Sequence, residues 1–255
     1  MEKTKYRIMQ YNILHDGDGW GWEQLAAPRT PAKERAANVR EIINKHDPDI
    51  LVLCERFEEW SDFCPEGYFL FGPSVGGVCR EERPKPEQLS TVNRNPIFLK
   101  SDKFCLIEGG IERLEGTEVD GTDFRHSYNK RVVTWGLVED YDKNVRFLVF
   151  ATHWQTDPEK REIHSRITSS LVKRIAARYG DKLPVIVTAD FNERADAPNF
   201  QRMLSELGLT NCVKQATSVD QIAVRGAVPT DSGMYTEEIT RYTSDHKPIW
   251  CDIEF

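Results

Sequence analysis

Short apolar runs recur along the chain, and most of them have the length of a β-strand. Each run is rich in β-branched or aromatic residues and is bounded by turn-forming or charged residues, a pattern typical of strands. The predicted strands cover residues 6–13, 50–54, 96–100, 132–138, 145–152, 184–189, 221–224 and 248–254. Strands 132–138 and 145–152 follow one another directly, which predicts that they pair in antiparallel orientation.

Three segments between these runs carry apolar residues at helical spacing. The first helix is predicted over residues 31–45, with Thr30 as its N-cap and a proline at its first position. The second is predicted over residues 158–179, where large apolar residues recur every four positions until Gly180. A shorter helix is predicted over residues 198–207. Helices placed among strands indicate an α/β fold with mixed sheets and helices outside them.

Four intervals between the predicted elements are long and rich in glycine, proline and charge. They cover residues 14–30, 72–95, 109–130 and 225–243. Because such lengths exceed those of ordinary connections, the intervals are candidates for binding loops. Trp20 and Trp22 in the first interval are candidates for stacking on a ligand, and packing within the loop is the alternative interpretation.

The composition indicates one folded domain over residues 1–255, because 39% of residues are hydrophobic, 29% are charged and no composition break occurs. No apolar run approaches the roughly 20 residues that span a bilayer, and no signal-type stretch opens the sequence. A cytoplasmic protein without a transmembrane segment is therefore expected. The six cysteines are scattered, which disfavours a disulfide framework. The net charge of −7 weighs against tight non-specific nucleic-acid binding, and no obligate protein partner is indicated.

Four predicted strands end on a side chain with catalytic chemistry. These side chains are Asn12, Glu55, His153 and Asp190. If the strands run side by side in one sense, their ends bring an amide, two carboxylates and an imidazole to one rim of a sheet, where pockets form. Asp245 and His246 precede the last strand, and an antiparallel strand starts at the edge where its neighbours end.

This set of side chains favours magnesium and phosphate chemistry. The hard oxygen ligands belong to Glu55, Asn12 and Asp245. Mg²⁺ is usually held by few protein oxygens, several waters and a substrate phosphate. His153 and His246 would donate to phosphoryl oxygens, and Asp190 would take a proton from an attacking water. Each residue alone also has an ordinary interpretation as a turn, ion pair or helix cap, but one shared site explains the strand ends together.

Eight short motifs follow one another along nearly the whole chain. They are Gln-Tyr-Asn-Ile-Leu at 10–14, Pro-Asp-Ile-Leu-Val-Leu-Cys-Glu at 48–55, Pro-Ile-Phe-Leu-Lys at 96–100, Arg-Val-Val-Thr-Trp at 131–135, Thr-His-Trp at 152–154, Thr-Ala-Asp-Phe-Asn at 188–192, Val-Asp-Gln-Ile at 219–222 and Ser-Asp-His-Lys-Pro at 244–248. The ordered set resembles the endonuclease/exonuclease/phosphatase superfamily, which has the deoxyribonuclease-I-like fold. Ala189 and Cys54 depart from the usual pattern, but neither departure removes a catalytic group.

The resemblance implies a four-layer α/β/β/α sandwich with two mixed, mainly antiparallel sheets and a site at one end. By position, it implies that Glu55, Asn12 and Asp245 hold Mg²⁺, with Mn²⁺ as a possible substitute. It also implies that Asp190 orients or deprotonates the attacking water.

The remaining implied roles concern the phosphate. Asn192 and Arg131 would contact it, and His246, oriented by Asp220, would stabilise the phosphorane opposite His153. In the family, an acidic residue or asparagine before the third strand often orients the first histidine. Asn93 is the nearest candidate for that position, and this pairing stays open.

The implied activity is metal-dependent hydrolysis of a phosphodiester or phosphomonoester by in-line attack of an activated water. The substrate is a phosphate ester, either a small molecule or a nucleic acid. A nuclease acting on DNA or RNA is the alternative within this class. A member of the family that binds phosphate without turnover is the alternative from another class. Endo or exo action, the number of metal ions and the oligomeric state do not follow from the sequence.

Overall fold

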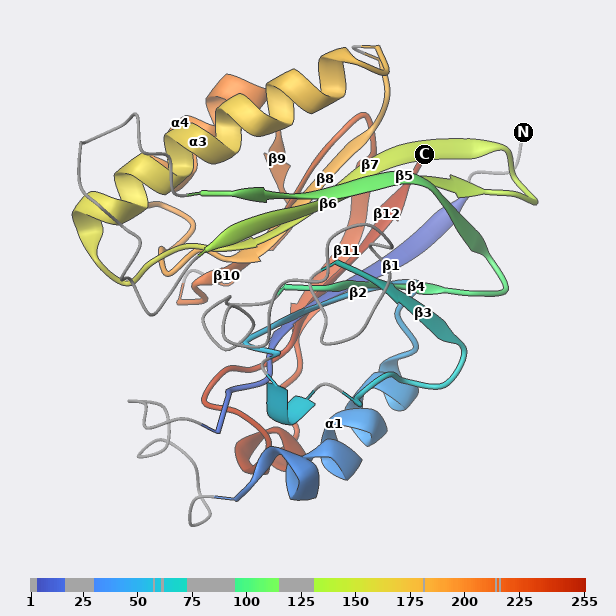
Figure 1. Cartoon of the computed structure of the whole chain (residues 1–255), viewed down its shortest axis with the longest axis vertical. Coiled ribbons are helices and arrows are strands. Elements are labelled where there is room, and N and C mark those ends of the chain that lie inside the picture. The colour runs from blue at the N-terminus through green and yellow to red at the C-terminus, as the bar shows by residue number, and fades with distance from the viewer. Residues whose placement is uncertain are drawn as a thin grey trace.

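Two six-stranded sheets lie face to face, and helices cover both outer faces (Figure 1). The structure is a computed structural model that describes residues 4–16, 30–56, 58–60, 62–72, 95–114, 131–180, 182–213, 215 and 217–255. The resulting order of layers, helix, sheet, sheet and helix, confirms the predicted α/β sandwich with mixed sheets. The predicted role of Trp20 and Trp22 lies outside the described residues.

The second sheet is formed by the middle of the chain, and the first sheet is formed by the strands before and after it. The first sheet has the order β11-β12-β1-β2-β4-β3 and contains β1 (Lys5–Asn12), β2 (Ile50–Cys54), β3 (Tyr68–Phe71), β4 (Ile97–Lys100), β11 (Val228–Met234) and β12 (Ile249–Glu254). The second has the order β5-β6-β7-β8-β10-β9 and contains β5 (Phe104–Arg113), β6 (Val132–Asp140), β7 (Val145–His153), β8 (Val185–Asp190), β9 (Thr210–Asn211) and β10 (Asp220–Arg225).

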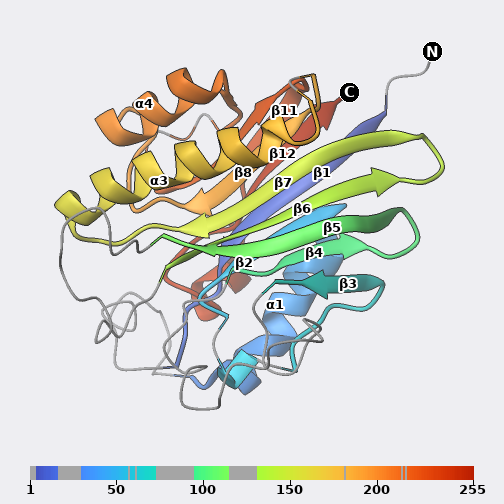
Figure 2. The ribbon, with the colours of Figure 1, turned by 45° about the horizontal axis from the view of Figure 1, so that its top comes forward.

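The helices connect and cover these strands. They are α1 (Ala32–His46), α3 (Pro158–Ala177) and α4 (Pro198–Leu207), with short 3-10 helices η2 (Glu58–Trp60) and η4 (Glu238–Tyr242). Figure 2 shows α3 and α4 on the outer side of the second sheet and α1 on the outer side of the first. No helix among the described residues is long and apolar enough to cross a membrane.

A parallel pair of strands stands at the centre of each sheet. β1 runs parallel to β2 until Asn12 lies beside Cys54, and β7 runs parallel to β8 until His153 lies beside Asp190. Parallel neighbours need a long crossover, and α1 and α3 supply it. β12 is antiparallel to β1, and β10 is antiparallel to β8. Each sheet therefore brings two strand ends, and the start of a third strand, to the same end of the sandwich.

Three apolar clusters fill the three interfaces between the layers. Between the sheets, the cluster includes Tyr6, Phe104 and Phe147. On the outer face of the second sheet, α3 and α4 bury apolar side chains such as Phe200. On the outer face of the first sheet, α1 and η2 do the same, with Trp60 fully buried. The hydrophobic effect of these three interfaces holds the layers together.

The helices show how far local signals determine their ends. Asp157 caps α3, because its carboxylate accepts hydrogen bonds from the backbone N–H groups of Glu159 and Lys160. The prediction of Thr30 as N-cap of α1 is wrong. The N-cap is Pro31, and the carboxylate of Asp16 accepts from the Ala32 N–H at 2.8 Å. A residue from the loop after β1 therefore replaces the local cap.

All eight predicted strands are present, with ends displaced by two residues at most. Four strands were missed: β3, β5, β9 and β11. Part of the interval 109–130 belongs to β5, and β11 lies inside the interval 225–243, so neither interval is wholly a loop. β5 and β11 are edge strands whose side chains are mostly exposed or half-buried, and apolar runs therefore do not mark them.

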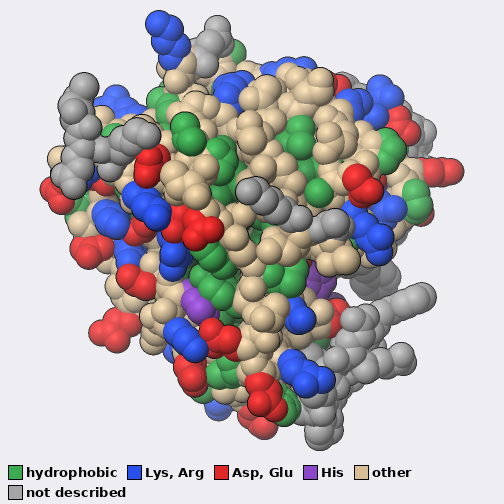
Figure 3. Space-filling view, turned by 180° about the vertical axis from the view of Figure 1, so that it is seen from behind, with side chains coloured by type: hydrophobic (Ala, Val, Ile, Leu, Met, Phe, Trp, Pro, Cys, Tyr) green, Lys and Arg blue, Asp and Glu red, His purple; other side chains and the backbone are tan. Residues whose placement is uncertain are grey.

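Acidic and basic side chains are interspersed on the face shown in Figure 3.

Candidate active site

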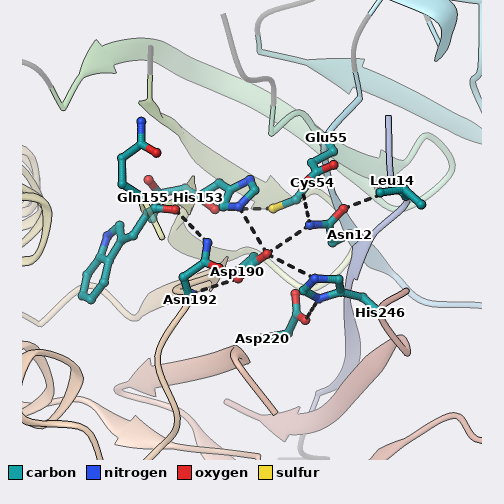
Figure 4. A network of polar contacts seen from close by, with 12 residues as sticks. Asn12, Leu14, Cys54, Glu55, His153, Gln155, Asp190, Asn192, Asp220 and His246 are labelled. Atoms are coloured by element: carbon teal, nitrogen blue, oxygen red, sulfur yellow. Dashed lines mark hydrogen bonds and ion pairs between the residues drawn. The ribbon is translucent and has the colours of Figure 1, made fainter. Parts of the chain in front are cut away.

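The predicted strand ends meet between the two sheets, around the buried carboxylate of Asp190 (Figure 4). Its Oδ2 accepts a hydrogen bond from Nδ2 of Asn12 at 3.0 Å and lies 3.2 Å from Nε2 of His153. Nε2 of His246 lies 3.7 Å from the same oxygen. Asn12 and His246 belong to the first sheet's side, and His153 and Asp190 to the second. The rim predicted for one sheet is thus formed by the ends of two.

Asn12 links the two central carboxylates. The same Nδ2 that donates to Asp190 also donates to Oε1 of Glu55 at 3.0 Å, and its Oδ1 accepts from the Leu14 N–H at 3.1 Å. Burial of Glu55 alone would raise the pKa of its carboxyl group. The nearby imidazoles of His153 and His15 and the Asn12 hydrogen bond outweigh burial, so this pKa lies below its usual value. Glu55 is therefore ionised at neutral pH.

His246 and Asp220 form the most direct charged contact of the site. Nδ1 of His246 lies 2.6 Å from Oδ2 of Asp220. Burial opposes protonation of His246, but the carboxylates of Asp220 and Asp190 outweigh it and raise the pKa of His246 well above its usual value. The other oxygen of Asp220 accepts from Nε2 of Gln10 at 3.2 Å. Because Nδ1 is held by Asp220, Nε2 of His246 faces Asp190.

Asp190 itself is strongly ionised. Burial raises the pKa of its carboxyl group, but the imidazoles of His153 and His246 and the hydrogen bonds from His153 and Asn12 lower it far below its usual value. The backbone N–H of Asn192 donates to the second oxygen at 2.9 Å. A fully buried carboxylate with this many donors is a feature of functional sites as well as of structural networks.

His153 has the opposite electrostatic setting from His246. It is buried, and burial together with the charge of nearby Arg131 lowers the pKa of its imidazole. Nδ1 of His153 and Oδ1 of Asn95 are both buried without a hydrogen-bond partner among the described residues. The Asn95 amide donates to the carbonyl groups of Val132 and Ala151, next to the end of β7. Asn93, the sequence candidate for orienting this histidine, lies outside the described residues.

A second histidine, His164 on α3, supports the segment that follows β7. Its Nδ1 accepts from the Gln155 N–H at 3.3 Å. Burial, with the charges of Arg131 and His153, lowers the pKa of His164 from 6.5 to about 3. The unfolded chain therefore binds a proton near pH 6.5 that the folded protein does not bind until about pH 3. This group stabilises the fold fully above the higher value and progressively less as the pH falls.

We expect a His164→Gln variant to have a weaker pH dependence of stability, because glutamine can accept the same N–H but does not titrate. Between about pH 7.5 and about pH 5, its free energy of unfolding should fall by about 1–2 kcal/mol less than that of the wild type. Urea unfolding at the two pH values measures this. An equal fall in both proteins would contradict the assignment of the proton to His164.

Backbone strain is concentrated at the site. Leu14, Glu55 and Asn192 are three of the five non-glycine residues described with positive φ, at 55°, 60° and 51°. This left-handed conformation costs L-residues about 1–2 kcal/mol each. The Asn192 amide is held in this arrangement by donating to the Trp154 carbonyl at 2.9 Å. The left-handed conformation turns the chain sharply after β2 and β8. Because of these turns, the side chains of Glu55 and Asn192 lie between the sheets (Figure 4).

Two groups of acidic residues could hold a cation. Ligand atoms of Asp190, Asp220 and His246 lie within 4.8 Å of one another, but His246 already forms a hydrogen-bonded pair with Asp220. Asp245 and Glu55 are the second candidate, since their like charges act on one another. Burial and the like charge of Glu55 raise the pKa of Asp245, although His246 opposes this. A cation would offset the repulsion between these carboxylates.

One member of the network was missed by sequence reasoning as a site residue. Gln10 lies fully buried on β1, donates to Asp220 and accepts from the Thr188 hydroxyl at 3.3 Å. A glutamine in the middle of an apolar strand is the signal that could have indicated it, because a buried amide needs partners. Arg131, in contrast, was predicted, and it lies buried before β6 beside His153 and His164.

A known protein family matches nearly the whole chain. The model of the Endonuclease/Exonuclease/phosphatase family matches residues 9–249 of the chain. The chain belongs to the endonuclease/exonuclease/phosphatase family. No curated protein sequence matches it. The family match covers all the residues predicted to form the site, from Asn12 to His246.

Solved structures share the fold of this family member at low identity. A mannosyl-6-phosphatase of Bacteroides thetaiotaomicron is 18% identical with a TM-score of 0.70, over 98% of this chain and 100% of that one. The human nocturnin catalytic domain with bound sulfate is 20% identical with a TM-score of 0.71, over 98% and 97%. D. rerio TDP2 with a single-strand DNA product is 14% identical with a TM-score of 0.67, over 99% and 100%. These likenesses establish the fold alone.

Proposed function

We propose that this protein hydrolyses phosphate esters in a reaction that needs a divalent cation, Mg²⁺ or Mn²⁺. The observation that carries the proposal is the buried, ionised Asp190, on which Asn12, His153 and His246 converge beside the carboxylate of Glu55. An imidazolium, an imidazole and two carboxylates at one end of a sandwich match the needs of phosphoryl transfer to water.

The proposed cation ligands are Glu55, Asp245 and Asn12. When bound there, the cation supplies positive charge that offsets the charge building on the phosphoryl oxygens. The side-chain Oδ1 of Asn12 accepts from the Leu14 N–H, but its second lone pair is available for a cation. Glu55 contributes a full negative charge, because its pKa is lowered. The residues present thus fit a hard divalent cation.

Asp190 is proposed to orient the attacking water and to accept its proton. Because the pKa of Asp190 is far below its usual value, the carboxylate is ionised throughout the neutral range. The same low pKa makes it a weak base. We therefore propose that it acts first by hydrogen bonding, which aligns an oxygen lone pair of water with phosphorus, and takes the proton only as the new P–O bond forms.

The two histidines are proposed to act on the phosphate in different protonation states. His246 has a raised pKa, so Nδ1–H donates to Asp220 while Nε2–H donates to a phosphoryl oxygen or to the leaving group. His153 has a lowered pKa and donates as a neutral imidazole. Arg131 and Asn192 are proposed phosphate contacts, and binding by Asn192 would exchange its hydrogen bond to the Trp154 carbonyl for one to substrate.

A substrate panel tests this proposal. It contains an aryl phosphodiester, sugar and inositol phosphates, nucleotides, sphingomyelin, RNA and DNA, each with Mg²⁺ and with Mn²⁺. The net charge of −7 favours a small phosphate ester over a long polyanion. We expect turnover of at least one class, its loss in chelator and its return when the cation is restored.

A Glu55→Gln variant makes the test specific to the site. We expect the concentration of Mn²⁺ that gives half-maximal activity to rise at least about tenfold, because a charged ligand becomes neutral. Glu112→Gln is the matched control, since Glu112 pairs with Arg174 on the outside of the second sheet. Wild-type cation dependence in Glu55→Gln, or full activity in chelator, would remove the basis of the proposal.

A further inference from the structure

Arg35 is an arginine with no exposed surface on the inner face of α1, the helix that connects β1 to β2. Its guanidinium donates five hydrogen bonds to residues outside the helix. The acceptors are the carbonyl groups of Ile13 at 2.7 Å, Leu14 at 2.7 Å, Thr243 at 2.6 Å and Thr30 at 2.8 Å, and Oδ1 of Asp16 at 2.9 Å. The ring of Trp60 packs against it with 5.0 Å between the guanidinium carbon and the ring centroid.

The first segment that Arg35 holds, residues 13–16, orients two of the proposed cation ligands. The Leu14 N–H donates to Oδ1 of Asn12 at 3.1 Å, and the His15 N–H donates to Oε2 of Glu55 at 3.2 Å. Arg35 binds the carbonyl groups on the opposite side of this turn. The segment is strained at Leu14, whose φ is 55°, so its shape depends on such external hydrogen bonds.

The second segment that Arg35 holds leads into Asp245 and His246. After Thr243, the Ser244 hydroxyl donates to the Asn12 carbonyl at 2.6 Å and accepts from the His246 N–H at 3.1 Å. One guanidinium therefore joins the loop after β1 to the loop before β12. The first loop donates hydrogen bonds to Asn12 and Glu55, and the second leads directly to Asp245.

We propose that Arg35 is a positioning residue of the active site: it fixes the separation between Asn12 and Glu55, which the loop after β1 contacts, and Asp245 on the loop before β12. The proposal rests on the function proposed above. Arginine suits the role because its planar fork presents five donors in fixed directions, which can bind carbonyl groups from two loops at once. Lysine has three donors on a flexible stem and cannot reproduce this geometry.

The test compares Arg35→Lys with Arg7→Lys. Arg7 ties the same elements together at the opposite end of β1, since it binds the carboxylate of Asp252 on β12 and the His46 carbonyl of α1. Mn²⁺ binding to the full chain, without substrate, is measured by calorimetry. We expect the dissociation constant to rise at least about tenfold in Arg35→Lys and to stay within about twofold of wild type in Arg7→Lys.

Amide hydrogen exchange in the absence of metal provides the second measurement. Arg35→Lys should speed the exchange of the Leu14 and His15 amides, which donate to Asn12 and Glu55, and Arg7→Lys should leave them unchanged. Faster exchange with unchanged Mn²⁺ affinity would show that Arg35 stabilises the loop without positioning ligands. Unchanged exchange would also overturn the proposal. A wild-type protein that neither binds Mn²⁺ nor hydrolyses any panel substrate would refute the proposed function instead.

If Arg35→Lys does not fold, Trp60→Phe tests the same inference with a smaller structural change. The Trp60 indole N–H donates to the Leu14 carbonyl at 3.2 Å, and its ring packs against Arg35. Loss of that bond should weaken Mn²⁺ binding and speed Leu14 exchange in the same direction, by a smaller factor. Wild-type values of both quantities in Trp60→Phe would contradict the inference.

Discussion

An Asp190→Asn variant is expected to stay folded and to lose about 10²–10⁴-fold in kcat. Asparagine has nearly the same shape, and its single side-chain oxygen keeps one of the two acceptor positions that bind Asn12 and the Asn192 N–H. It cannot take a proton from water, and it removes one of the charges, second to that of Asp220, that raise the pKa of His246. Steady-state kinetics on the best substrate of the panel, with circular dichroism as the check on folding, measures the change.

The matched control is Asp252→Asn. Asp252 is also buried, but its carboxylate pairs with Arg7 and Lys5 on the first sheet, away from the site. This variant should lose stability and keep its kcat within about twofold, since no catalytic contact changes. A kcat of Asp190→Asn close to that of Asp252→Asn would mean that Asp190 has a structural role only.

A Phe147→Ala variant is expected to lose about 3–5 kcal/mol of unfolding free energy. Phe147 on β7 is fully buried between the sheets, where its ring lies 6.0 Å from that of Tyr6, 5.7 Å from that of Phe104 and 5.4 Å from that of Phe255, between centroids. Truncation removes apolar contacts on both sheets and leaves a cavity at their interface. Urea unfolding with linear extrapolation measures the loss.

Tyr141→Ala serves as its control, because Tyr141 lies in the turn between β6 and β7 and is exposed. Its replacement should change the unfolding free energy by about 0.5 kcal/mol or less. Similar losses in the two variants would indicate that the inter-sheet cluster contributes little to stability. A loss in Phe147→Ala much below the expected range would indicate that the sheets close over the cavity.

The sequence predicts the buried strands and helices well and the edge strands poorly. β2 and β8 are buried at every position, so β2 appears as an unbroken apolar run and β8 begins with three β-branched apolar residues. β11 has the sequence Val-Pro-Thr-Asp-Ser-Gly-Met and pairs with β12 through a register shift. Its backbone belongs to the sheet because a neighbour offers hydrogen bonds, and its own residues do not favour a strand.

The sequence names candidate site residues, but it does not give their arrangement. Polar residues at the ends of predicted strands indicated Glu55 and Asp190 as candidates. The apolar runs, however, do not determine which strands belong to the same sheet. The structure places the two residues on different sheets, joined by Asn12. The roles of Gln10 and Arg35 were not predicted, for a related reason. Their partners, Asp220 and Thr243, lie more than 200 positions away along the chain, and only tertiary structure brings such groups together.

The pairing of β1 with β12 has a consequence for refolding. The first described strand is complete only when the last one joins it, with Lys5 beside Glu254, and the Ser244 hydroxyl reaches the Asn12 carbonyl across 232 residues. Contacts this distant along a chain form slowly. Catalytic competence should therefore return with the slowest refolding phase, later than helical circular dichroism. Until then β1 presents an unpaired edge to other chains, and dilute conditions should favour recovery.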